Sequence, residues 1–312
     1  MVLKGVQPSA AVVPAGADAV AEPARRRATA VVFAALRVRQ WTKNLLVFAG
    51  IVFAAKLGDP VRWVEAIACF VAYCAASSAA YLVNDVRDVE ADRAHPTKRL
   101  RPIASGALAP RTALALAAAL GGLALALVVP LGLASLALLV LFVALHAAYT
   151  LSLKHLVLVD VFAIAALFVV RATAGAVAVD VPISPWLYLC TGLLALFLAL
   201  GKRRAELVLV EARETPGRRV LDGYTLALID QLVGIVASAT IAAYALYTFT
   251  ARDSSTLMAT IPYVVFGIFR YLLLLHRHQA GEEPEQVLLK DVPTLVAVAL
   301  WGVTCAAILA LD

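Results

Sequence analysis

The chain has 312 residues, of which 62% are apolar and only 15% are charged, against about 25% charged residues in soluble domains. Its mean hydropathy is +0.88, so it lacks the polar residues that a soluble globule of this size needs on its surface. The composition also excludes a disordered chain, a fibrous repeat and a disulfide scaffold. A polytopic membrane protein is the class that remains.

The first residues differ from the rest of the chain. Residues 1–24 are rich in Ala, Val and Pro without a sustained apolar run, and no signal peptide is evident. We predict that residues 1–34 form a tail, disordered or lying on the membrane surface, and that residues 35–312 form one transmembrane domain. The four cysteines lie in apolar stretches without a Cys-x-x-Cys pair, which favours simple packing over zinc or redox chemistry.

A membrane-spanning helix needs about 20 apolar residues. Nine segments qualify: 41–57, 63–84, 112–130, 132–152, 156–179, 185–201, 224–249, 258–275 and 292–311. The uncharged stretch between Arg111 and Lys154 would form about 63 Å of helix, twice a hydrocarbon core of about 30 Å, so we predict a turn at Pro130-Leu131-Gly132. The sequence therefore predicts an all-α, polytopic membrane bundle of about nine transmembrane helices.

The net charge of +6 follows the predicted topology. With the N-terminus inside, 22 of the 27 Lys and Arg residues fall on the cytoplasmic side and three on the other side. Such a split is the positive-inside pattern, and it predicts a cytoplasmic N-terminus and an external C-terminus. Topology accounts for the basic charge, so we expect no nucleic-acid partner.

An acidic motif follows the second predicted span. Asn84, Asp88 and Asp92 are spaced i, i+4, i+8, which on a helix places them within about 80° of one face. Asp85 lies on the same side. Oxygen ligands at the cytoplasmic end of a bundle suit Mg²⁺, which shares its coordination shell with substrate phosphates and waters. No cation is interleaved at i, i+4 spacing, so we expect these carboxylates to repel one another without a metal.

Basic clusters lie on the same predicted side of the membrane. A metal together with Lys and Arg side chains is how proteins hold a polyphosphate. In the first span, Arg39 and Lys43 are four residues apart, a spacing that shares one face of an α-helix. The other clusters contain Arg87, Lys98, Arg99, Lys154 and the run Lys202-Arg203-Arg204.

Two ionisable residues fall within the predicted membrane depth. Asp160 and Arg171 both lie in the fifth span, and such residues usually face the bundle interior. They are eleven residues apart, so a direct structural pair between them would need a bridging group. Either they pair through such a group or they serve the substrate.

These residues resemble a known family. The pattern Asn84-Asp-x-x-Asp88-x-x-x-Asp92 after a second membrane helix resembles the first signature of the UbiA superfamily of intramembrane prenyltransferases, over residues 35–312. The resemblance implies a bundle of about nine helices around a lipid-accessible cavity, with Asp-rich motifs that hold Mg²⁺ and a diphosphate. The usual second motif, Asp-x-x-x-Asp, is absent after the sixth span, where the sequence reads Gly201-Lys-Arg-Arg-Ala-Glu206.

Longer strings resemble one branch of this family. They are Gln40-Trp-Thr-Lys43-Asn44, Tyr81 to Asp92, His95-Pro-Thr-Lys98-Arg99 and Gly201-Lys202-Arg203. That branch transfers 5-phosphoribose from phosphoribosyl pyrophosphate to a polyprenyl phosphate such as decaprenyl phosphate, the first committed step toward the arabinose donor of certain bacterial cell walls. The resemblance implies Mg²⁺ as cofactor and a site facing the cytoplasm in the bacterial plasma membrane. The donor also carries a 5-phosphate, which needs cations rather than carboxylates.

Residue patterns and resemblance together give the predicted site. The predicted metal ligands are Asn84, Asp88 and Asp92. The predicted catalytic residues are Asp85, Asp88, Asp92 and Asp160, of which Asp160 or Asp92 would stabilise oxocarbenium character at the anomeric carbon. The predicted substrate-binding residues are Arg39, Lys43, Arg87, Lys98, Arg99, Tyr149, Lys154, Arg171, Lys202, Arg203 and Glu206.

Two other functions stay open. An ordinary family member would move a prenyl group from its diphosphate to another acceptor, and this chain lacks the second acidic motif of such an enzyme. A secondary transporter for an anionic substrate would show inverted repeats and broken helices near the midplane, and no clear repeat is present. The sequence also leaves open whether the chain forms a homo-oligomer.

Overall fold

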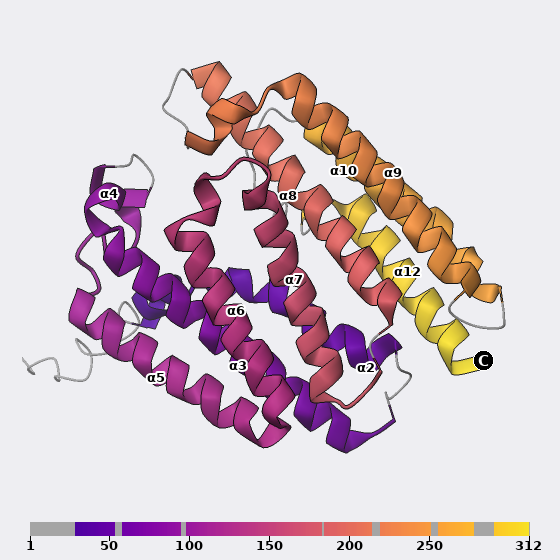
Figure 1. The fold of residues 1–312 in the computed structure, drawn as a ribbon, viewed down its shortest axis with the longest axis horizontal. Coiled ribbons are helices and arrows are strands. Elements are labelled where there is room, and N and C mark those ends of the chain that lie inside the picture. Colours follow the sequence, from indigo (N-terminus) through magenta and orange to yellow (C-terminus); the bar gives the residue numbers. More distant parts are fainter. Residues whose placement is uncertain are drawn as a thin grey trace, which may run out of the picture.

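The computed structural model describes residues 29–53, 58–94, 98–182, 184–213, 219–250, 255–277 and 290–311. The longer elements are η1 (Val38–Phe48), α2 (Ala49–Phe53), α3 (Pro60–Arg87), α4 (Val89–Ala94), α5 (Pro110–Val128), α6 (Leu133–Leu151), α7 (Val159–Ala178), α8 (Pro185–Arg213), α9 (Leu226–Thr250), α10 (Ile261–Arg277) and α12 (Val292–Leu311). All regular elements in these ranges are helices (Figure 1). The predicted all-α class is confirmed.

Six helical segments in the described ranges are long and apolar enough to cross a membrane. They are Pro60–Arg87, Pro110–Leu131, Leu133–Leu151, Val159–Ala178, Leu226–Thr250 and Thr256–Arg277. Each coincides with a predicted span. Two further predicted spans, 185–201 and 292–311, correspond to α8 and α12. The count of nine is not confirmed, because the first predicted span takes a different form.

That first span, predicted over 41–57, is not one α-helix. Its described part consists of the 3₁₀ segment η1 followed by the five residues of α2. A 3₁₀-helix rises about 2.0 Å per residue, so η1 extends over about 22 Å and the whole of 38–53 over about 30 Å, the thickness of the hydrocarbon core. Runs of 3₁₀ longer than three or four residues are uncommon, and this one is held by the side-chain contacts of the buried Asn44 described below.

The predicted turn between the third and fourth spans is confirmed. A short 3₁₀ turn, η3 (Val129–Leu131), ends α5, and Gly132 follows with φ 98°. Glycine is favoured there because a side chain would make this left-handed backbone conformation costly. The turn lets α5 and α6 run as neighbours in opposite directions.

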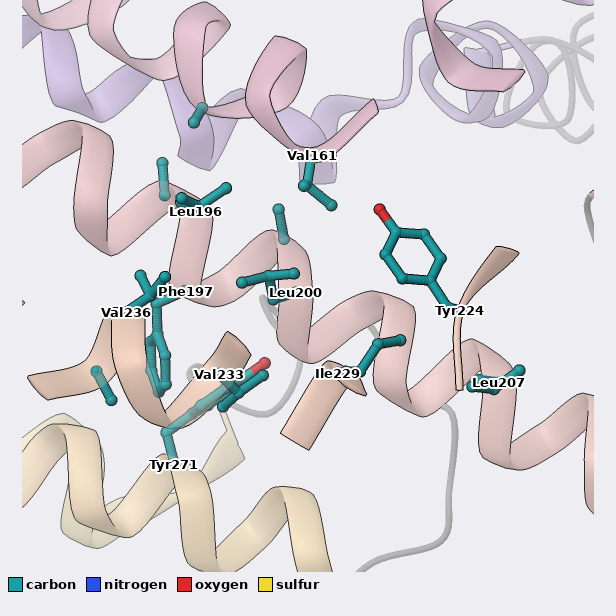
Figure 2. Close-up of a cluster of buried hydrophobic side chains, with 14 of the residues drawn as sticks. Val161, Leu196, Phe197, Leu200, Leu207, Tyr224, Ile229, Val233, Val236 and Tyr271 are labelled. Carbon is teal, nitrogen blue, oxygen red and sulfur yellow. The ribbon is translucent and has the colours of Figure 1, made fainter. Parts of the chain in front are cut away.

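Helix α7 lies at the centre of the described bundle. In its most apolar stretch 61% of the residues are buried inside the protein, against 17% for α5 and 22% for α6. One apolar cluster joins it to α8, α9 and α10 through residues such as Val161, Phe197 and Tyr271 (Figure 2). A second cluster joins it to η1, α3, α5 and α6. Charged residues on α7 are therefore enclosed by other helices.

Helix α7 meets the first span with almost no space between the two backbones. A Cβ placed on Gly175 would lie 1.8 Å from the carbonyl oxygen of Val47, and one on Gly50 would lie 2.7 Å from Cα of Ala176. Glycine at both positions permits this close approach, as small residues do between membrane helices. The approach brings the polar residues of η1 against α7.

Gly175→Ala is expected to lower the free energy of unfolding by about 1–3 kcal/mol, because the new Cβ overlaps backbone atoms that cannot rotate away. Denaturant unfolding of the purified protein in detergent micelles measures this. Gly234→Ala in α9 is the matched control, since open space surrounds that position and Ala favours a helix. Equal stability of the two variants would contradict the close approach.

The connections gather at two ends of the bundle. The chain reaches α4, the α6–α7 connection and the end of α8 at the upper left and top of Figure 1. The α5–α6 and α7–α8 turns and the C-terminal end of α12 lie at the bottom and right. The Lys- and Arg-rich segments of the sequence therefore share one end, as the alternating charge pattern predicts.

Candidate active site

The acidic motif spans a one-residue interruption of the helix. α3 ends at Arg87, Asp88 has φ −90° and ψ 11°, and α4 begins at Val89. The backbone N–H of Asp88 still donates to the carbonyl of Asn84 at 2.9 Å, and that of Asp92 to the carbonyl of Asp88 at 2.8 Å. The helical i, i+4 spacing of the three motif residues therefore persists through the interruption.

Two carboxylates of the motif are buried and paired with arginines. Arg37 Nη2 donates to Asp85 Oδ1 at 2.6 Å, and the Arg37 guanidinium stacks 4.7 Å above the Tyr81 ring. Arg101 Nη1 donates to Asp92 Oδ2 at 2.7 Å and to Asp85 Oδ1 at 3.2 Å. The prediction that the carboxylates repel one another without a metal is wrong, because their counter-ions are Arg37, directly before η1, and Arg101 in the loop after α4.

Asn84 and Asp88, unlike Asp85 and Asp92, are not paired with arginines in the described structure. Both side chains are half-buried, and neither forms a hydrogen bond or ion pair with another described residue. Their oxygens are thus available at the C-terminal end of α3, beside the paired carboxylates of Asp85 and Asp92. Of the three predicted metal ligands, Asp92 is paired with an arginine, and Asn84 and Asp88 are not.

These oxygens fit a metal that takes few protein ligands. In the described part of the chain no three His, Cys, Asp or Glu side chains are grouped so that they could hold a metal by themselves. Mg²⁺ usually keeps several waters and is bound through one or two carboxylates plus substrate phosphates. The Asp88 carboxylate and the Asn84 amide oxygen are donors of this kind, and Asp92 is bound by Arg101 in this structure.

A second network surrounds Arg203 on α8. The Arg203 side chain is 1% exposed, donates from Nε to Asp160 Oδ2 at 2.6 Å, and pairs through Nη1 with Glu206. Nη2 donates to the Tyr149 hydroxyl at 3.1 Å. The structure therefore brings together four predicted site residues from α6, α7 and α8. Arg203 is enclosed by these partners, so the prediction that it contacts substrate directly does not match its environment.

Tyr224 completes this network, and the sequence analysis missed it. Its hydroxyl donates to Asp160 Oδ1 at 2.9 Å and accepts from the backbone N–H of Leu158 at 2.8 Å. Burial raises the pKa of Tyr224 to about 12, so the phenol keeps its proton and donates. Figure 2 shows the Tyr224 ring directed toward Val161 at the start of α7. Tyr224 lies 64 residues from Asp160 in the chain, and no sequence pattern links them.

Leu158 has an unusual backbone. Its φ is 67°, a value that residues other than glycine seldom adopt. The hydrogen bond from its N–H to Tyr224 holds this conformation at the N-terminus of α7, two residues before Asp160. Backbone strain of this kind is often found at functional sites.

Arg171 does not pair with Asp160. Its Nε donates to Asn44 Oδ1 at 2.7 Å and its Nη1 to the Leu167 carbonyl at 3.0 Å. Its guanidinium carbon lies 4.7 Å from the Phe142 ring centre. Asn44 in turn donates to Cys74 Sγ at 3.3 Å. Arg171 thus fixes η1 against α7 in the bundle interior, and Asp160 belongs to the separate network of Arg203.

Unpartnered polar atoms lie near Arg171. The Tyr73 hydroxyl, the Ser77 hydroxyl and His146 Nε2 are buried without a hydrogen-bond partner in the described structure. The ring centres of Tyr73 and His146 lie 4.9 Å and 5.0 Å from that of Phe142. His146 is absent from the predicted site, and its position in an apolar helix gave no signal. The positive charges of Arg171 and Lys43 both interact electrostatically with the His146 side chain.

The geometry of Arg39 and Lys43 corrects one expectation. Because η1 has three residues per turn rather than 3.6, residues four apart are about 120° apart around the axis. Arg39 and Lys43 therefore do not share a face. Among the predicted binding residues, Arg39, Arg87 and Arg99 are exposed, and Lys43, Lys98, Lys154 and Lys202 are half-buried. Residues 95–97 of the basic string lie outside the described residues.

Arg204 connects neighbouring helices of the bundle. Its Nε pairs with Asp230 and its Nη1 donates to the Leu275 carbonyl at 3.1 Å. These contacts join α8 to α9 and α10. Arg203 and Arg204 of the run Lys202-Arg203-Arg204 thus both pair with carboxylates of the protein.

Comparison with known proteins gives consistent matches. Residues 45–292 match the UbiA prenyltransferase family. The chain is 36% identical over 282 residues to a decaprenyl-phosphate phosphoribosyltransferase of Mycolicibacterium smegmatis, covering 86% of this chain and 88% of the relative. It is 38% identical over 304 residues to a protein of the same name from Mycobacterium tuberculosis, covering 94% of this chain and 98% of the relative.

A solved structure supports the fold. A UbiA homolog from Archaeoglobus fulgidus, bound to DMAPP and Mg²⁺, superposes with a TM-score of 0.69 at 15% sequence identity, covering 90% of this chain and 99% of that one. The family match extends over more than two thirds of the chain and includes both networks except for Arg37. With the helical architecture and the acidic motif after the second span, these matches show that the chain belongs to the UbiA prenyltransferase family.

Proposed function

We propose that the chain transfers 5-phosphoribose from phosphoribosyl pyrophosphate to decaprenyl phosphate, or a similar polyprenyl phosphate, and releases diphosphate. Relatives that carry this name align along most of the chain. The acceptor is a membrane lipid, which suits a bundle whose outer helices are apolar and exposed. A role in cell-wall arabinan precursor synthesis stays a prediction from the resemblance.

The observation that carries the proposal is the cation in the second network. An enzyme with two acidic motifs would offer carboxylates after the sixth span for a metal. Here Asp160 and Glu206 both bind Arg203, which is 1% exposed. The guanidinium of Arg203 thus lies among these carboxylates, and in the described residues the motif at Asn84, Asp88 and Asp92 is the one left for a metal. This arrangement differs from the two acidic motifs expected of a family member that uses a prenyl diphosphate donor.

The reaction requires little proton chemistry. The acceptor phosphate is already anionic and nucleophilic, so its oxygen can bond to the anomeric carbon while the bond to diphosphate breaks, without a strong general base. When bound, Mg²⁺ would neutralise charge on the leaving diphosphate. Asn84 and Asp88 would hold the metal, and the remaining contribution of the protein is to position donor and acceptor.

Formation of product tests the proposal directly. The purified chain is incubated with labelled phosphoribosyl pyrophosphate, decaprenyl phosphate and Mg²⁺, and a lipid-soluble phosphoribosyl product is expected. When a prenyl diphosphate replaces phosphoribosyl pyrophosphate as the donor, no prenylated product is expected. Transfer of the prenyl group to an acceptor, with no phosphoribosyl product, would establish the other family activity instead.

Lys202→Ala is expected to raise the apparent constant for phosphoribosyl pyrophosphate roughly ten- to a hundred-fold, since a hydrogen bond to a charged group contributes about 1.5–3 kcal/mol. Lys202 is a half-buried cation at the position where the wider family carries its second acidic motif. The constant for the polyprenyl phosphate should change much less. Arg277→Gln, at the exposed end of α10, is the control, and an unchanged donor constant in Lys202→Ala would remove this residue from the site.

We also propose that the site faces the cytoplasm of a bacterial plasma membrane, with the N-terminus inside and the C-terminus outside. The charge distribution supports this orientation. Single cysteines introduced at positions 98 and 253 of an otherwise cysteine-free variant test it with a membrane-impermeant reagent in intact cells. Labelling of position 253 alone is expected, and labelling of both positions would contradict the orientation.

A further inference from the structure

Four charged side chains form a closed set at the acidic motif. Asp85 Oδ1 accepts from Arg37 Nη2 at 2.6 Å and from Arg101 Nη1 at 3.2 Å. The same Arg101 nitrogen donates to Asp92 Oδ2 at 2.7 Å. One guanidinium nitrogen thus bridges two carboxylates that are seven residues apart. We call these four residues the arginine–aspartate quartet.

The quartet has no net charge, and its two carboxylates are buried. The side chains of Asp85 and Asp92 are each 5% exposed, and those of Arg37 and Arg101 are 25% and 29% exposed. Buried carboxylates are stable only when opposite charge compensates them. Two arginines supply the two compensating charges, so the acidic motif needs no metal for its stability.

This neutrality has a consequence for metal binding. Mg²⁺ at Asn84 and Asp88 that also takes Asp92 Oδ2 must displace Arg101 from that oxygen. The metal alone would then leave guanidinium groups beside a divalent cation, and like charges at short distance repel. A diphosphate supplies the missing negative charge, and guanidinium groups bind phosphate oxygens with charge-assisted hydrogen bonds.

We propose that Arg37 and Arg101 are exchangeable counter-ions, which compensate Asp85 and Asp92 in the ligand-free protein and bind the diphosphate when a metal takes their place. Metal and diphosphate therefore bind with positive cooperativity. The inference rests on the metal–diphosphate site of the proposed function. It adds two diphosphate-binding residues to that site and a reason why neither ligand binds well alone.

The backbone around both arginines suits such an exchange. Arg37 has φ 51° and ψ 48°, in the left-handed region, at the junction between helical residues 29–36 and η1. Arg101 lies in the turn after α4, where its N–H donates to the Lys98 carbonyl at 2.9 Å. Neither arginine lies within a long helix, so each can move its partly exposed side chain without disturbing the bundle.

The test measures binding of Mn²⁺, as a spectroscopic substitute for Mg²⁺, to the full chain in detergent micelles by electron paramagnetic resonance, with and without inorganic pyrophosphate. In the unmodified protein, pyrophosphate is expected to tighten Mn²⁺ binding about tenfold or more, in the usual range of coupling between sites. In Arg101→Gln, Mn²⁺ alone is expected to bind more tightly than in the unmodified protein, while the effect of pyrophosphate shrinks to about threefold or less.

Arg37→Gln is expected to change both quantities in the same directions, which keeps the test valid if one variant folds poorly. Arg111→Gln is the matched control, because Arg111 is exposed at the start of α5 on the same side of the bundle. It is expected to behave like the unmodified protein. Weaker Mn²⁺ binding by Arg101→Gln without pyrophosphate, or an unchanged pyrophosphate effect in both variants, would overturn the exchange.

Pyrophosphate carries neither a sugar nor a lipid, so this experiment does not depend on the identity of the donor. Cooperative Mn²⁺–pyrophosphate binding in a chain that makes no phosphoribosyl product would remove the proposed function and leave the exchange standing. Product formation with unchanged coupling in both variants would do the reverse.

Discussion

Replacing Asp88 by Ala is expected to abolish measurable turnover while leaving the fold intact. The side chain makes no hydrogen bond or ion pair with another described residue, so its loss removes no structural contact. Loss of one ligand from a site with few protein ligands should cost about 3–4 kcal/mol of transition-state stabilisation, or a rate decrease of about 10²–10³. Steady-state kinetics and denaturant unfolding of the same preparation measure both effects.

Glu90→Ala is the matched control for Asp88→Ala. Glu90 is an acidic residue on α4 whose side chain is 83% exposed and pairs only with the exposed Arg93 in the described structure. Its removal is expected to leave both turnover and stability unchanged. Wild-type activity in Asp88→Ala, or activity that EDTA does not diminish, would refute the metal site. Asp92→Ala should also be inactive, but it releases Arg101 as well and is harder to interpret.

Asp160→Ala is expected to destabilise the protein by about 3–5 kcal/mol, because it removes one of the two carboxylates that compensate the charge of the enclosed Arg203. The same substitution removes the acceptor of the Tyr224 hydroxyl. Arg203→Ala should have a similar effect, because it leaves Asp160 buried without a cation. Denaturant unfolding in micelles measures the loss.

A double variant separates the two contributions. Asp160→Leu with Arg203→Met removes both charges, and it is expected to be more stable than either single alanine variant, since a well-packed apolar pair often matches a buried ion pair. Arg277→Ala, at an exposed site, is the control and should unfold like the unmodified protein. Single variants of unchanged stability would show that the Arg203 network does not support the fold.

The burial and contacts of Arg203 revise the role that the sequence predicts for it. As a donor ligand it would change mainly the apparent constant for phosphoribosyl pyrophosphate. In the structure Asp160, Glu206 and Tyr149 enclose it, so its substitution should act first on the positions of these partners. Lys202 remains the member of this run that we assign to a donor phosphate.

The sequence by itself determined the class, most of the spans and one half of the site. Hydropathy is a local property, and so is the need for a turn at Gly132, because a membrane-spanning helix has a fixed length. The register of Asn84, Asp88 and Asp92 follows from helix geometry within one segment, and it persists in the backbone. Each of these features depends on residues close together in the chain.

Only the tertiary structure decided which charges meet. Arg37 pairs with Asp85 across 48 residues, and Arg203 with Asp160 across 43. Their partners depend on how the helices are placed around α7, which no periodicity encodes. The 3₁₀ form of η1 likewise depends on contacts with α7, where Arg171 binds Asn44 and Gly175 meets Val47. A buried charge must find its counter-ion wherever packing places one, and packing is a property of the whole bundle.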